Sequence, residues 1–187
     1  MIPFDAAQTW TSFEKFKDRP RTPRQVQILQ TVIDHSRAEV AGDIDGVMAT
    51  LTADPQYHDY GVYPGVVSDT GPKGLDAVVG LYRAMVDCGS YVIESQKHRV
   101  IVDDERLVSE GTFRQILPAA AAHAQGLVGA DATGHFLVTA RTVVFWEFDE
   151  AGRAKGEDRY VFVQSVDPLD EADLPADYPD RLRMARA

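Results

Sequence analysis

The sequence predicts a single α+β domain in which helices come first and an antiparallel sheet follows. Up to Gly89, apolar residues recur mainly at three- and four-residue steps, as on helices that bury one face; beyond it they recur at every second residue, as on half-buried strands. The chain has 187 residues, 44% of them hydrophobic and 26% charged, which suits one domain with one sizeable core.

The first 21 residues are predicted to form an amphipathic extension. Trp10, Phe13 and Phe16 are spaced as on one side of a helix, so we expect this segment to pack an aromatic edge on the domain and to take no part in catalysis. The domain itself is expected to cover residues 22–165.

A long helix is predicted to begin at Thr22. Thr22, Pro23 and Gln25 occupy the N-cap, N1 and N3 positions, which favours a capping box and a proline-initiated first turn. An apolar stripe then runs to Gly42, formed by Ile28, Leu29, Val32, Ile33 and Val40. Asp43 is predicted to cap a second, shorter helix that ends near Leu51.

Residues 54–74 hold several glycines and prolines, so a short strand at 56–60 should be followed by an irregular loop. Apolar residues from Leu75 to Val86 return to helical spacing and predict a third helix that ends near Gly89.

Four strands are predicted after the third helix, at residues 91–102, 106–117, 135–148 and 157–165, with hairpin turns at 103–105 and 149–152. The connection 118–134 is longer than a hairpin turn and rich in alanine and glycine. Residues 166–187 show no periodicity and are predicted to be an irregular tail that orders only against the domain or a partner.

Charge and composition exclude several classes of partner. A net charge of −10 and a pI near 4.8 leave no basic surface for nucleic acid or anionic membranes. The N-terminus lacks the apolar core of a secretory signal, so a cytoplasmic protein is expected. Cys88 is the only cysteine, which excludes a disulfide framework and a thiolate zinc site, and we expect it to be buried.

Four segments carry a family resemblance: 41–47 (AGDIDGV), 51–54 (LTAD), 57–59 (YHD) and 74–78 (GLDAV). In this order they resemble the nuclear transport factor 2-like superfamily, particularly its SnoaL-like and ketosteroid-isomerase-like branches, over residues of about 25 to 163. The resemblance implies a cone, made by a curved antiparallel sheet around the long helix, with a pocket for a small hydrophobic molecule. It also implies pairing into a homodimer through the outer sheet face, where Arg141, Val143, Phe145 and Glu147 lie on one side of a strand.

The resemblance to the isomerases also assigns roles to individual residues. Asp59 stands where they carry the proton-shuttling base, and His35 stands where they carry a tyrosine that donates to the substrate oxyanion. Tyr57 should face the same way as Asp59, because it is two residues earlier on the strand. The place of the second oxyanion donor holds Val144, a departure from the isomerases. Alternatively, Asp59 only shapes the turn before Gly61.

The inward face of the last strand stays open. By resemblance to epoxide-hydrolase-like and cyclase members, Glu157 and Arg159 point into the pocket and bind substrate. The alternation within the strand partly favours the opposite face, because Tyr160 and Phe162 are in phase with Asp158.

The strands at 135–148 and 91–102 supply two further candidates. The first has one continuous apolar face, which should line the cone and make Trp146 a pocket wall or a core residue. On the second, Glu94, Gln96 and His98 share a face with Val92, Val100 and Val102, which fits either a pocket mouth, with His98 binding substrate, or a solvated sheet surface.

Two functions are compatible with these observations. The first is a cofactor-free isomerase, cyclase or dehydratase in which a carboxylate removes a proton next to a carbonyl group. The second is a non-catalytic ligand-binding or dimerisation domain. No metal is expected, because His58, Asp59 and His98 lack a ligand spacing such as HExxH.

Overall fold

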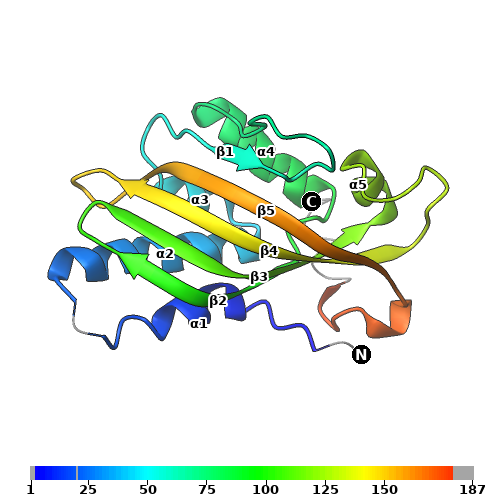
Figure 1. Ribbon diagram of the computed structural model, residues 1–187, viewed down its shortest axis with the longest axis horizontal. Coiled ribbons are helices and arrows are strands. Elements are labelled where there is room, and N and C mark those ends of the chain that lie inside the picture. Colours follow the sequence, from blue (N-terminus) through cyan, green and yellow to red (C-terminus); the bar gives the residue numbers. More distant parts are fainter. Residues whose placement is uncertain (1–2, 20, 179–187) are drawn as a thin grey trace.

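The computed structural model describes residues 3–19 and 21–178. The described elements run in the order α1 (Gln8–Glu14), α2 (Pro23–Ala41), α3 (Ile44–Ala49), β1 (His58–Tyr60), α4 (Leu75–Asp87), β2 (Ile93–Val102), β3 (Arg106–Pro118), α5 (Ala119–Ala124), β4 (His135–Phe148), β5 (Ala154–Leu169) and a short 3₁₀ helix, Glu171–Asp173 (Figure 1). Helices thus precede the main sheet, as predicted.

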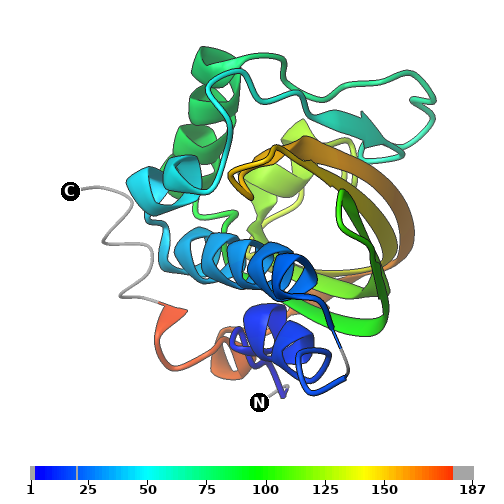
Figure 2. The same cartoon turned by 90° about the vertical axis from the view of Figure 1, so that its left-hand side faces the viewer.

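The sheet is curved and open, with the strand order β1-β5-β4-β3-β2. Strands β2 to β5 form the antiparallel meander that the sequence predicts. Strand β1, whose pairing the sequence did not indicate, adds to β5 in parallel. Figure 2 shows the strands curling around α2, which lies in the concavity with α1 beside it. This confirms the cone built around the long helix.

Helix α2 begins and ends at the predicted residues. Thr22 and Gln25 form the reciprocal capping box, and Gly42 ends the helix in a left-handed conformation with φ of 68°. The predicted apolar stripe is buried, with Ile28, Leu29 and Val32 each 0% exposed. Asp43 caps α3 by accepting a hydrogen bond from the Gly46 N–H, so α2 and α3 are fixed by local signals.

The alternation of β4 agrees with the prediction. Val138, Ala140, Thr142, Val144, Trp146 and Phe148 are all buried. Phe145 on the opposite face is 40% exposed, so the inner and outer faces of the sheet are unambiguous along this strand.

Strand β2 departs from the prediction because it contains an irregularity in its register between Lys97 and Arg99. Such a bulge reverses which side chains point inward. Ile93, Ser95 and Lys97 therefore line the interior before the bulge, while Val100 and Val102 are buried after it. The single face proposed for residues 92–102 was wrong for this reason.

Helix α1 lies against the free edge of β2. The Thr9 hydroxyl accepts a hydrogen bond from the Ser95 N–H at 3.1 Å, and the Ser12 hydroxyl donates to the Ser95 carbonyl at 3.3 Å. Phe13 and Phe16 are buried in the main core, as their spacing predicts. The extension is thus attached to the sheet by side-chain contacts to edge-strand backbone.

Three further features differ from the sequence predictions. Strand β5 continues to Leu169 instead of ending at residue 165. Tyr178, in the predicted irregular tail, is buried with Val92 and Ile116 in a second apolar cluster, while residues 179–187 lie outside the described part of the chain. Cys88, expected to be buried, is exposed. Within the described residues, the helices are too short or too polar to cross a bilayer.

Candidate functional site

A cavity of about 70 Å³ lies between α2 and the concave face of the sheet. All four long strands contribute to its wall, together with α1 and α2. Its lining consists of Thr9, Phe13, His35, Ser36, Glu39, Ile93, Ser95, Lys97, Phe113, Thr142, Val144, Trp146, Glu157, Arg159 and Val161. The interior therefore combines aromatic and aliphatic walls with five ionisable side chains.

His35 sits in this wall, is 1% exposed and is held at both ring nitrogens. Its Nδ1 lies 2.8 Å from the Thr50 hydroxyl, which itself donates to the Val47 carbonyl at 2.7 Å. Because the only hydroxyl hydrogen of Thr50 is used there, His35 Nδ1 must be the donor. In the neutral ring, Nε2 is then an acceptor.

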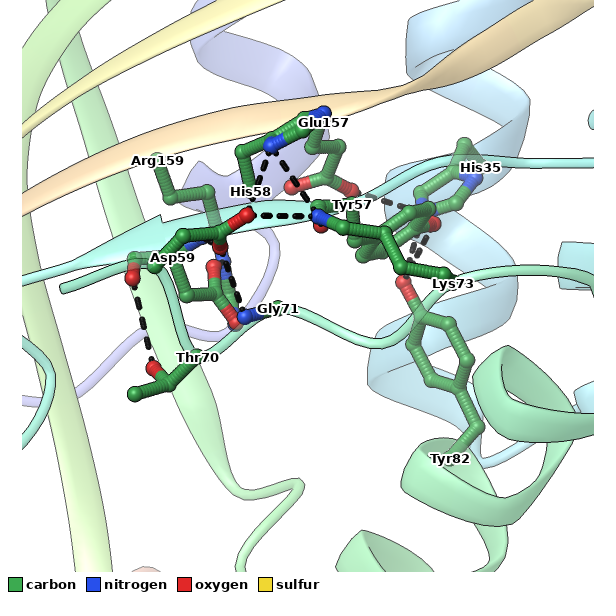
Figure 3. A network of polar contacts seen from close by, with 11 residues as sticks. His35, Tyr57, His58, Asp59, Thr70, Gly71, Lys73, Tyr82, Glu157 and Arg159 are labelled. Carbon is green, nitrogen blue, oxygen red and sulfur yellow. Dashed lines mark hydrogen bonds and ion pairs between the residues drawn. The ribbon is translucent and has the colours of Figure 1, made fainter.

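A pair of buried tyrosines extends this chain of hydrogen bonds (Figure 3). The Tyr82 hydroxyl is 3.0 Å from His35 Nε2, and the Tyr57 hydroxyl is 3.1 Å from that of Tyr82. Burial raises the pKa of both tyrosines well above the usual value, with the Glu157 carboxylate adding to the effect. Both remain phenols, so Tyr57 donates to Tyr82 and Tyr82 donates to His35.

Asp59 and Arg159 form a bidentate ion pair between β1 and β5. Arg159 Nε lies 2.6 Å from Asp59 Oδ1, and Nη2 lies 2.8 Å from Oδ2. Both carboxylate oxygens are thus engaged, and Asp59 is 5% exposed. This geometry fixes the plane of the Arg159 guanidinium group. Arg159 lines the cavity, whereas Asp59 is not part of the cavity wall.

A second carboxylate anchors β1 from the loop side. Asp69 accepts hydrogen bonds from the backbone N–H groups of Asp59 and Gly71 and contacts both His58 and Lys73. Although burial acts to raise the pKa of Asp69, these hydrogen bonds lower it far below the usual value. The carboxylate is therefore ionised, and the loop after β1 is held against the strand.

Glu157 projects into the cavity from β5. It is 7% exposed, and its Oε1 lies 3.4 Å from His35 Nε2. Asp158 instead lines a hollow on the outer face, and Tyr160 stacks on Tyr60 with ring centroids 5.0 Å apart. Of the two alternatives for the last strand, the structure therefore has Glu157 and Arg159 inward.

Two ionisable residues of the cavity were not singled out from the sequence. Glu39 lies one turn after His35 on α2, and burial followed by the neighbouring Glu157 carboxylate raises its pKa. Lys97 on β2 donates to the Ser95 hydroxyl at 2.7 Å, and burial lowers its pKa to about 8. The spacing from His35 could have indicated Glu39, but the bulge in β2 hides Lys97.

The structure brings together only some of the residues predicted from the sequence. His35, Trp146, Glu157 and Arg159 line one cavity. Tyr57 and Asp59 contact it indirectly, through Tyr82 and Arg159. His98 lies apart, exposed, with its Nε2 2.9 Å from the Thr112 hydroxyl. Over residues 3–19 and 21–178, no three His, Cys, Asp or Glu side chains are grouped so as to hold a metal ion.

The sequence matches the family of SnoaL-like domains over residues 32–156. The chain therefore belongs to this family, and the predicted resemblance is confirmed. The matched segment begins in the middle of α2 and reaches the start of β5, and it leaves out α1. None of the curated proteins matches the sequence.

Solved structures support the same fold. A proposed SnoaL-like polyketide cyclase from Jannaschia sp. CCS1 is similar with a TM-score of 0.58 and 13% identity, over 76% of this chain and 90% of the other. A second one, from Shewanella denitrificans OS-217, has a TM-score of 0.57 and 13% identity, over 83% and 96%. An NTF2-like protein of unknown function from Burkholderia pseudomallei K96243 has a TM-score of 0.51 and 20% identity, over 86% and 98%.

Proposed function

We propose that this protein is a cofactor-independent enzyme of the isomerase, cyclase or dehydratase kind that removes a proton next to a carbonyl group. The observation that carries the proposal is the position of Glu157. Its carboxylate is buried in the cavity beside His35, and no hydrogen bond within the described residues occupies it. Such a group is free to accept a proton from a bound molecule.

The proposed reaction begins with transfer of a carbon-bound proton to Glu157. The electron pair of the broken C–H bond forms a C=C bond, and the carbonyl π electrons move onto oxygen. The protonated Glu157 then lies beside His35, whose Nε2 is 3.4 Å from Glu157 Oε1 and already accepts a hydrogen bond from Tyr82. Return of the proton to another carbon completes an isomerisation without any external reactant.

Glu39 is the proposed acid of the same cavity. Burial and the neighbouring Glu157 carboxylate raise its pKa, so that Glu39 keeps its proton at a higher pH than an ordinary glutamate. A carboxyl group with a raised pKa suits the role of a general acid. In a cyclisation, Glu39 would protonate the carbonyl oxygen that gains an electron pair. In a dehydration, it would protonate the hydroxyl group that leaves with one.

In this proposal Asp59 orients Arg159. The alternative prediction, in which Asp59 is itself the base, requires the carboxylate to exchange its two Arg159 hydrogen bonds for a substrate. When Asp59 only orients Arg159, the charge of Arg159 stays beside the cavity and is matched by Asp59. The ion pair then contributes a fixed dipole with no net charge.

The proposed substrate is small. A cavity of about 70 Å³ is well below the several hundred Å³ of common ligand pockets. A ring system fits only if α1, which supplies Thr9 and Phe13 to the wall, moves away from β2. One structural neighbour, TerC, was co-crystallised with polyporic acid, which makes that compound a reasonable larger probe.

The test is deuterium exchange into small acyclic ketones such as acetone and butanone, followed by proton NMR in D₂O. The protein should accelerate exchange, and Glu157→Gln should reduce the acceleration by about a hundredfold to ten-thousandfold. Asp158→Asn, one residue along and on the outer face, is the matched control and should retain it. Exchange that is equally fast with and without the protein would contradict the proposal.

A non-catalytic binding or dimerisation domain is the second candidate, favoured by the small cavity and by an exposed apolar outer face. Ile101 is 73% exposed and Phe145 40%, and both border an outer hollow of about 850 Å³. Adjacent ion pairs, Arg106 with Glu147 and Arg141 with Glu110, give this face both signs of charge. A homodimer through this face is proposed, and light scattering at the monomer mass of 20.6 kDa would contradict it.

A further inference from the structure

We propose that Lys97 is a catalytic residue of the cavity, and that its ammonium group holds the oxygen of a small enolate or similarly acidic oxygen compound. This inference rests on the proposed function, because it assigns the group that faces the developing negative charge. It also narrows the substrate class to compounds whose oxygen becomes anionic next to the reacting carbon.

The need for such a donor follows from the way His35 is held. Its Nδ1–H is used by Thr50, and its Nε2 accepts from Tyr82 and faces Glu157. The neutral ring therefore has no N–H left for a substrate oxygen, although the sequence predicted His35 as the donor. An enolate requires hydrogen-bond donors near the oxygen where the charge develops.

Lys97 has unused donors in the right place. Its ammonium group donates to the Ser95 hydroxyl at 2.7 Å and lies 5.2 Å from the ring centroid of Phe13. Among the described residues, no carboxylate oxygen lies within ion-pair distance of it, so two of its three N–H bonds remain available. Lys97 on β2 and Glu157 on β5 line the same cavity from two strands that are separated in the sheet by β3 and β4.

Arg159, the other cation of the wall, is less suited to this task. Its Nε and Nη2 donors are bound to Asp59, which balances its charge. Lys97 instead lies near Glu157 and Glu39, whose carboxylates favour its charged form against burial. When Glu157 and the substrate exchange a proton, the negative charge moves to the substrate oxygen, and Lys97 stays opposite to it.

The experiment uses 2,4-pentanedione, a small 1,3-diketone whose enolate has its own ultraviolet absorption band. Binding to the wild-type protein at pH 7 should increase that band reversibly. Lys97→Met, which keeps the length of the side chain without its charge, should weaken enolate binding by about tenfold to a hundredfold. Lys155→Met removes an exposed lysine at the outer hollow and should bind as the wild type does.

Three outcomes would overturn the inference. These are an unchanged enolate band in the wild-type protein, equal enolate affinity in Lys97→Met, and an absorption that survives dialysis in the wild type but not in Lys97→Met, which would make Lys97 a covalent nucleophile. Lys97→Gln, which retains a neutral donor, should give intermediate binding and covers the case in which Lys97→Met does not fold. If Lys97→Met weakens enolate binding but Glu157→Gln leaves ketone exchange unchanged, the inference stands and the proposed base is wrong. If Glu157→Gln reduces ketone exchange but Lys97→Met binds the enolate normally, only the role of Lys97 is wrong.

Discussion

Arg159 and Lys97 are two cations of one cavity that are held in opposite ways. Arg159 on β5 is matched by a bidentate carboxylate, and the neighbouring His35 is hydrogen-bonded at both nitrogens. Lys97 on β2 has one hydroxyl partner and an aromatic ring. The β5 side therefore has its geometry fixed before any ligand arrives, while the β2 side has donors left to offer. A cation whose charge is matched by a carboxylate can position a site, and a cation without such a partner can bind an anion in it. In this sense of charge balance the β5 side is saturated and the β2 side is unsaturated.

The largest expected effect comes from breaking the saturated side. Asp59→Asn leaves the Arg159 charge largely buried without its ionised partner, which should lower the free energy of unfolding by about 3 kcal/mol in urea denaturation. Asp158→Asn on the outer face is the control. A variant that loses ketone exchange but keeps its full stability would instead identify Asp59 as the base, as the resemblance predicts.

A smaller effect, with a distinct pH dependence, is expected on the unsaturated side. Burial lowers the pKa of Lys97 from 10.5 to about 8, so the folded state opposes its charging, despite Glu39 on α2 and Glu157 on β5. The free energy of unfolding should therefore be highest, as far as Lys97 is concerned, above pH 10.5. It should fall by about 3 kcal/mol at most as the pH decreases to 8.

Lys97→Met lacks this cost of charging. Its stability relative to the wild type should therefore rise as the pH falls from 10.5 to 8 and then stay level. Urea denaturation of both proteins at several pH values measures the difference, in which other titrating groups largely cancel. A pH-independent difference would mean that Lys97 is well solvated, and the contrast with Arg159 would then disappear.

The smallest effect is expected at the far end of the hydrogen-bond chain. Tyr57→Phe removes one hydroxyl but leaves the Tyr82 bond to His35 intact, so stability should fall by about 1 kcal/mol. Tyr82→Phe, which removes the donor to His35 itself, is the matched comparison and should also alter ketone exchange. Equal effects of both variants on exchange would show that the chain acts as a unit.

Local signals made much of the fold predictable. The capping box at Thr22, the left-handed Gly42 and the alternation of β4 each depend on a few neighbouring residues, and each was found as predicted. The parallel pairing of β1 with β5 joins residues about a hundred positions apart, and no short-range pattern reports it. Fold class was therefore accessible where the individual strand pairing was not.

The cavity was predictable only in part, for a similar reason. His35, Trp146, Glu157 and Arg159 were found by resemblance and alternation, and they do line it. Lys97 was missed because one bulge reverses the alternation of β2. Regular alternation predicted that His98 points inward, whereas the structure has it exposed. Asp59 was found, but its pairing with Arg159 depends on the register between β1 and β5.

The two hydroxyl contacts from α1 to Ser95 have a consequence for association between copies of the chain. An edge strand with free N–H and C=O groups is a template on which another strand can add, and proteins cover such edges to prevent it. Thr9 and Ser12 occupy the two backbone groups of Ser95, near the start of β2. Helix α1, which closes the cavity wall, thus also hinders the addition of a strand from another copy at this edge. Any movement of α1 that admits a larger ligand exposes the edge of β2 for as long as the ligand takes to enter.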